Sequence, residues 1–198
     1  MKEPDTEKKS YLKSGVLNAW RQRIVWLLIM MFSATFTQII IAGFEAKLRT
    51  VVLLTAFIPM LMGTGGNCGS QSSVSVIRSL ALKEIGVRDV KMVLWTEFRI
   101  ALLSGLTLGT VCFFKILYLD RILLQAPEID VPIALTVSLS LTVTVLIAKF
   151  IGCILPLISQ KLGFDPAVTA APFITTIVDA LALLTYFCIA SLLLAERF

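Results

Sequence analysis

The run that decides the fold is Ile24-Val-Trp-Leu-Leu-Ile-Met-Met-Phe-Ser-Ala-Thr-Phe-Thr-Gln-Ile-Ile-Ile-Ala-Gly-Phe44, which holds 21 residues and no charged side chain. A helix needs roughly 20 apolar residues to cross the hydrocarbon core of a bilayer. The run is therefore long enough to cross once. It begins only after Arg23 and is longer than the apolar part of a secretory signal peptide. We therefore predict a transmembrane helix here.

Four more apolar windows follow: 50–77 without a charge, and 100–119, 131–160 and 166–195 with one charge each, at Lys115, Lys149 and Asp179. Apolar residues make up 57% of the 198 residues, more than the core of a soluble domain of this length needs. We predict an all-α membrane protein with five transmembrane helices near 24–44, 50–78, 93–119, 131–160 and 166–195. Residues 1–23 would be a cytosolic amphipathic segment, and 24–198 one five-helix domain.

The distribution of basic residues predicts the orientation. With the N-terminus in the cytoplasm, the inner segments hold Lys2, Lys8, Lys9, Lys13, Arg21, Arg23, Arg78, Lys83, Arg88, Lys91, Arg99 and Lys161. The outer segments hold only Lys47, Arg49, Lys115, Arg121 and Arg197. The positive-inside rule therefore places the N-terminus inside and the C-terminus outside, in the cell (plasma or inner) membrane. The net charge of +5 is explained by attraction to anionic lipid, so a nucleic-acid partner is not needed.

The second window contains a stretch that is too polar for an ordinary span: Gly63-Thr-Gly-Gly-Asn-Cys-Gly-Ser-Gln-Ser-Ser-Val-Ser75. In a bilayer, a broken or loosened helix survives only where it is buried in protein or faces water. At helical spacing, Asn67, Ser70 and Gln71 share a face with Gly63. We count Asn67 as a candidate metal ligand, and Ser70 and Gln71 as candidate pore-lining residues. The alternative is a dry seam of small residues, with the amides as hydrogen bonds between helices.

Asp179 is the one carboxylate deep in a predicted span. An aspartate at a helix centre costs roughly 2.5–3.5 kcal/mol on insertion scales, so such residues normally face a cavity or a partner. Thr175, Thr176 and Pro172 precede it at helical spacing and extend a polar stripe. The alternative is a protonated Asp179 bonded to a neighbouring helix or paired with Lys149. We interpret Lys149 instead as snorkelling towards the inner surface.

The residue types limit the metal that such a site could hold. Histidine is absent, and the four cysteines lie singly in predicted spans. What remains is carboxylate, amide, hydroxyl and carbonyl oxygen, which suits Mg²⁺, Ca²⁺ or Mn²⁺ rather than zinc or copper. A two-fold dimer axis along a pore would bring a second Asp179, and Mg²⁺ would keep much of its water shell.

Two motifs resemble the MgtE family of magnesium channels. They are Pro59–Gln71, with Thr-Gly-Gly-Asn-Cys-Gly-Ser-Gln at 64–71, and the pair formed by 162–167 and 172–179. The resemblance implies a homodimer of five-helix subunits with a pore between them, formed by the second and fifth helices. The transported ion would be Mg²⁺.

The resemblance also assigns residues. Asp179 matches the central metal-binding aspartate, and backbone oxygens near Gly63, Gly66 and Thr175 would line the same site. Asp165 matches a carboxylate at the inner mouth, where further Mg²⁺ binds, although the residue also suits an ordinary helix N-cap before Pro166. Members usually carry a cytosolic N-terminal domain and paired CBS domains. These 198 residues contain neither, so regulation by those domains is not carried over.

Other functions fit the sequence less well. A carrier that couples divalent cations to sodium or protons would use Lys149 and Asp179 as titrating groups. An intramembrane aspartyl protease needs two carboxylates, and a serine or cysteine nucleophile would have no histidine base. We therefore do not expect an enzyme. A purely structural membrane subunit is favoured only if the polar face of the second span is packed and dry.

Overall fold

The computed structural model describes residues 15–164 and 166–197, and for a few of these, including Ala167–Pro172, it describes the backbone alone. Every regular element in these ranges is a helix. Five helical spans are long and apolar enough to cross a membrane: Val16–Gly43, Val52–Ala81, Val90–Leu123, Val131–Lys161 and Phe173–Leu193. The predicted all-α fold with five spans is thus confirmed.

The chain forms two compact units, residues 1–35 and 36–198. The described part of the first is the N-terminal portion of α2 (Val16–Gly43), in which the Ser33 hydroxyl donates to the Met30 carbonyl oxygen at 2.9 Å. Asp165 and most of the predicted 1–23 segment lie outside the described residues. From Val16 onwards this segment is continuous with the apolar span.

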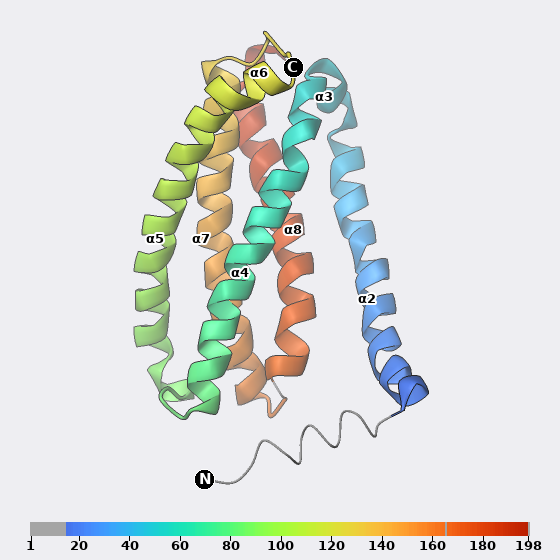
Figure 1. Ribbon diagram of the computed structural model, residues 1–198, viewed down its shortest axis with the longest axis vertical. Coiled ribbons are helices and arrows are strands. Elements are labelled where there is room, and N and C mark those ends of the chain that lie inside the picture. The colour runs from blue at the N-terminus through green and yellow to red at the C-terminus, as the bar shows by residue number, and fades with distance from the viewer. Residues whose placement is uncertain (1–14, 165, 198) are drawn as a thin grey trace. The chain divides into compact units, whose positions relative to one another are not determined.

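The second unit contains four long helices, α4 (Ile58–Ala81), α5 (Val90–Phe114), α7 (Val131–Lys161) and α8 (Pro166–Leu193), which run lengthwise beside one another (Figure 1). Short elements precede α4: α3 (Glu45–Thr50) and the 3-10 helix η1 (Val52–Phe57). The 3-10 helix η2 (Val87–Asp89) leads into α5, and η4 (Ala195–Arg197) follows α8. The C-terminus, α3 and α6 lie at one end, which we call the C-terminal end (Figure 1).

The α7 helix is the central helix, because it packs against α4, α5 and α8. It begins where Asp130 accepts a hydrogen bond from the Ile133 N–H at 3.1 Å, a standard N-cap, and Pro132 occupies its first turn. The buried hydroxyls of Thr136 and Ser140 donate to carbonyls one turn back, those of Pro132 and Thr136, at 2.8 and 2.6 Å. Polar side chains can thus lie inside an apolar bundle with their hydrogen bonds satisfied.

Two hydrogen bonds to α8 and an ion pair just after it stabilise the C-terminal end of the bundle. The buried Tyr186 hydroxyl donates to the Leu54 carbonyl at 2.9 Å, and Lys47 Nζ donates to Ser191 Oγ at 2.7 Å. Arg197 forms an ion pair with Asp130. Partial burial acts to raise the pKa of Asp130, but the hydrogen bonds from Arg197 and the Ile133 N–H outweigh it and hold the pKa below its usual value.

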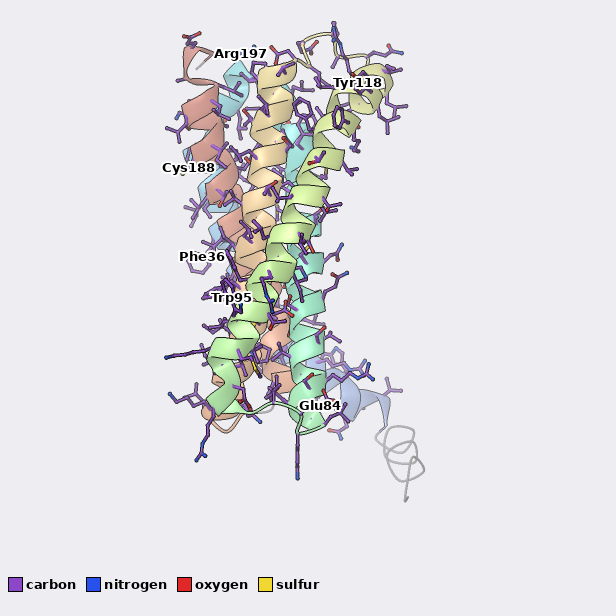
Figure 2. All side chains as sticks on the ribbon, turned by 90° about the vertical axis from the view of Figure 1, so that its left-hand side faces the viewer. Phe36, Glu84, Trp95, Tyr118, Cys188 and Arg197 are labelled. Atoms are coloured by element: carbon purple, nitrogen blue, oxygen red, sulfur yellow. The ribbon has the colours of Figure 1, made fainter. Side chains whose placement is uncertain are left out.

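Beyond α5 the chain forms a π-helical segment, η3 (Lys115–Asp120), and then the single turn α6 (Arg121–Leu123). Lys115 Nζ lies 2.8 Å from both carboxylate oxygens of Asp120. Residues five apart do not meet on an α-helix, but the wider π turn brings them together. Figure 2 shows Tyr118 and Arg197 at the C-terminal end and Glu84, in the α4–α5 connection, at the opposite end.

Candidate functional site

The glycine-rich stretch of the second span is a continuous α-helix within Ile58–Ala81. The interpretation of a broken or loosened helix is therefore wrong. An unbroken helix satisfies its backbone N–H and C=O groups internally and needs no cavity for this purpose. Carbonyl oxygens of the helix retain a second lone pair for an ion, so the proposal of backbone ligands stays open.

One face of α4 is packed tightly. A Cβ added at Gly65 would lie 2.8 Å from Thr144 Cγ2 and 2.9 Å from Val178 Cγ1. At Gly69 it would lie 2.9 Å from Ile174 Cγ2, and a Cβ on Gly152 of α7 would overlap the Gly69 carbonyl. The alternative of a small-residue packing seam thus holds for this face, where α4 meets both α7 and α8.

A second face of α4 is open. A Cβ added at Gly63 or at Gly66 would meet no atom within 4 Å in the described part of the chain. These are two of the backbone positions that the resemblance assigns to the metal site. The open face therefore leaves room for an ion, for water or for another chain.

Asp179 lies on α8 next to Val178, whose side chain is buried against the Gly65 position of α4. The carboxylate is thus at the level of the glycine-rich stretch. Among the described residues it has neither a hydrogen-bond partner nor an ion-pair partner, and it is partly buried. An aspartate without a partner inside a span is the arrangement expected of an ion-binding group.

The other residues predicted on α8 are only partly described. Thr175 is exposed and Thr176 is partly buried, and both belong to the helix turn before Asp179. Pro172 is helical in its backbone, but its side chain is outside the described residues, as is all of Asp165. Their roles as pore-lining residue and inner-mouth ligand stay predictions.

Asn67, Ser70 and Gln71 line cavities between α4 and α5 that reach α7. Their roles as metal ligand and pore-lining residues stay predictions. One cavity, of about 730 Å³, is lined by Asn67, Ser70, Gln71, Ser72, Val74, Ser75, Glu97, Ile100 and Lys149. A neighbour of about 550 Å³ shares Asn67, Gln71 and Lys149 with it. A third, of about 200 Å³, shares Ser75 and Glu97. Adjoining cavities thus lie along the seam between α4 and α5, each with several polar side chains in its lining.

In the 730 Å³ cavity, the Ser72 hydroxyl links two charged side chains, Glu97 and Lys149. Ser72 Oγ donates to Glu97 Oε2 at 2.6 Å, and Lys149 Nζ donates to Ser72 Oγ at 3.4 Å. Lys149 is only 5% exposed, so the interpretation that it snorkels to the inner surface is replaced by a hydrogen bond within the bundle. Glu97 and Ser72 were not among the residues predicted from the sequence. The available signal was an acidic residue inside the predicted 93–119 helix.

The described residues contain no group of three or more histidine, cysteine, aspartate or glutamate side chains able to hold a metal. A divalent cation at Asp179 would therefore need backbone oxygen, water or a second chain as further ligands. This suits Mg²⁺, which keeps several waters and binds through one or two carboxylates.

The chain is similar in sequence to a known family and to curated relatives. Residues 58–189, from the start of α4 almost to the end of α8, match the MgtE family, described as a divalent cation transporter. The chain is 36% identical over 184 residues to the magnesium transporter MgtE of Thermus thermophilus, covering 93% of this chain and 39% of that protein. It is also 36% identical over 170 residues to the magnesium transporter MgtE of Bacillus subtilis, covering 86% and 36%. The chain thus spans well under half the length of these relatives.

Proposed function

Since the chain belongs to the MgtE family of divalent cation transporters, we propose that it is a channel for hydrated Mg²⁺ with Asp179 as its central ion-binding residue. The pore would be lined by α4 and α8. The observation that carries this proposal is the carboxylate of Asp179, which has no partner among the described residues and lies level with the open positions on α4.

The electrostatics favour a divalent cation at this place. An ionised carboxylate in a span is costly without a counter-charge, and a bound cation supplies one. A single carboxylate balances half the charge of Mg²⁺. A homodimer with its two-fold axis along the pore would supply two copies of Asp179 and complete the balance.

The same proposal includes the membrane orientation. The excess of basic residues in the N-terminal segment and the 78–99 segment supports a cytoplasmic N-terminus and an outer C-terminus. Under this orientation the C-terminal end of the bundle is the outer end. The inner mouth would then lie near Asp165.

The test is Mg²⁺ uptake into vesicles that contain the purified chain, followed with a Mg²⁺-sensitive dye inside them. We expect Asp179→Asn and Asp179→Ala to reduce uptake to the level of empty vesicles, because each removes the counter-charge from the pore. The matched control is Glu128→Gln, which removes an exposed carboxylate from the 120–130 connection and should leave uptake unchanged. Wild-type uptake in both Asp179 variants would reject the proposed site.

The same vesicles separate a channel from a coupled carrier. A channel moves Mg²⁺ down its own gradient at a rate that does not change when a sodium or proton gradient is added. A carrier accelerates or reverses with such a gradient. Dependence on either gradient would replace the channel by a cation-coupled transporter.

A further inference from the structure

The polar cavity between α4 and α5 contains a pair of opposite charges that the proposed pore does not use. Glu97 comes from α5 and Lys149 from α7, and Ser72 of α4 joins them, accepting from Lys149 at 3.4 Å and donating to Glu97 at 2.6 Å. Lys149 is 5% exposed, and it has three N–H donors, of which this contact uses one. Its charge is therefore poorly screened, and Glu97 is the compensating charge in that cavity.

The position of Glu97 and Lys149 beside α4 matters for the proposed ion path. The cavity lined by Glu97 and Lys149 is also lined by Asn67, Ser70 and Gln71, three residues of α4 that are predicted to lie along the ion path. A field from the pair would act on an ion beside α4 through a polar cavity and one helix. Because the interior of a helix bundle screens charges less than bulk water does, the field of the pair extends beyond its direct contacts.

We infer that Glu97 and Lys149 together set the electrostatic potential that a divalent cation meets beside α4: Lys149 repels the ion, and Glu97 cancels this repulsion. The inference rests on the proposed function and deepens it, because it names two residues that tune ion entry without being ligands. Conduction requires binding that is strong enough for an ion to enter and weak enough for it to leave. Because the charges of Glu97 and Lys149 cancel, Asp179 remains the dominant charge on the ion path. The strength of ion binding is then determined by Asp179.

A purely structural role predicts something different. If the pair only ties α4 to α5 and α7, loss of either partner leaves an uncompensated charge, buried in the case of Lys149 and half-buried in the case of Glu97, and weakens the bundle. Both single variants would then lose uptake. An electrostatic role predicts effects of opposite sign, since one variant leaves a positive charge and the other a negative one.

The experiment measures the Mg²⁺ concentration at half-maximal uptake, the maximal rate and the thermal unfolding temperature for four variants of the full chain. They are Glu97→Gln, Lys149→Met, the double variant, and Glu84→Gln as the matched control. Glu84 also accepts a hydrogen bond from a serine of α4, Ser79 at 3.1 Å, but it is exposed and outside the cavity. It should behave as wild type.

We expect Glu97→Gln to raise the half-maximal Mg²⁺ concentration about tenfold, which corresponds to about 1.4 kcal/mol, and Lys149→Met to lower it. The double variant should return to within about threefold of wild type. Shifts of the two single variants in the same direction, or a double variant no better than Glu97→Gln, would overturn the inference. If Glu97→Gln does not fold, Lys149→Met alone decides, because an unchanged or raised concentration overturns the inference.

The two proposals fail in different ways. If wild type passes no Mg²⁺, or Asp179→Asn passes as much as wild type, the proposed function is rejected and the inference falls with it. If Asp179→Asn abolishes uptake but the Glu97 and Lys149 variants shift together, the proposed function stands and only the charge-pair inference is rejected.

Discussion

Two faces of α4 contain glycine, and the structure uses them differently. Gly65 and Gly69 lie against Val178 and Ile174, so close that no side chain fits. Gly63 and Gly66 meet nothing within 4 Å among the described residues. One glycine-rich stretch can therefore form both a packing seam and an open surface, because successive residues of a helix point about 100° apart.

The sharpest way to test the packed face is Gly152→Ala on α7. The new Cβ would lie 2.8 Å from the Gly69 carbonyl carbon and would overlap its oxygen. Because both of these atoms belong to the backbone of α4 and cannot rotate away, α4 and α7 would have to move apart. We expect the variant to lose about 3 kcal/mol of stability, measured as thermal or denaturant-induced unfolding in detergent. Wild-type stability would show that α4 and α7 are not in close contact there.

The matching change on the open face is Gly66→Ala. No atom of the described chain lies in the way, and alanine favours a helix over glycine by up to about 1 kcal/mol. Stability should therefore be unchanged or higher. If the open face lines the proposed pore, Mg²⁺ uptake should nevertheless fall severalfold, because a methyl group narrows the passage. Lower stability would place a neighbouring element on this face instead.

A smaller effect is expected from Thr144→Val, which tests whether the packed face is dry. Thr144 Oγ1 is buried and has no hydrogen-bond partner within the described residues, while its Cγ2 faces Gly65. Valine keeps the shape and removes the unsatisfied hydroxyl. Stability should rise by up to about 1 kcal/mol. A fall by a similar amount would indicate a water bound at the seam.

The sequence predicted the five spans because the length of an apolar run is a local property. It also singled out Asp179, since a carboxylate isolated in a span is visible without knowing its neighbours. It placed the start of the second span at 50, close to Val52, where the span begins in the structure. The α-helix begins at Ile58, with Pro59 in its first turn, and residues 52–57 form a 3-10 helix. Proline is favoured in a first turn, where its missing N–H costs nothing.

The division of α4 into two faces could not be predicted in the same way. Whether Gly65 or Gly66 is covered depends on the angle at which α4 meets α7 and α8, which composition does not encode. Glu97 was missed for a related reason, because it resembles one more charge of the 78–99 segment. The packing of α5 beside α4 is needed to show that Glu97 accepts a hydrogen bond from Ser72. The same serine accepts from Lys149.

The π-helical segment at Lys115–Asp120 has a consequence for how the chain tolerates insertions and deletions. A π turn holds one residue more than an α turn, so deleting one residue there would let α5 continue as an ordinary helix. The Lys115–Asp120 pair would change from five residues apart to four, which is a favourable spacing on an α-helix. Homologous chains one residue shorter at this point should therefore keep the pair and the rest of the bundle intact.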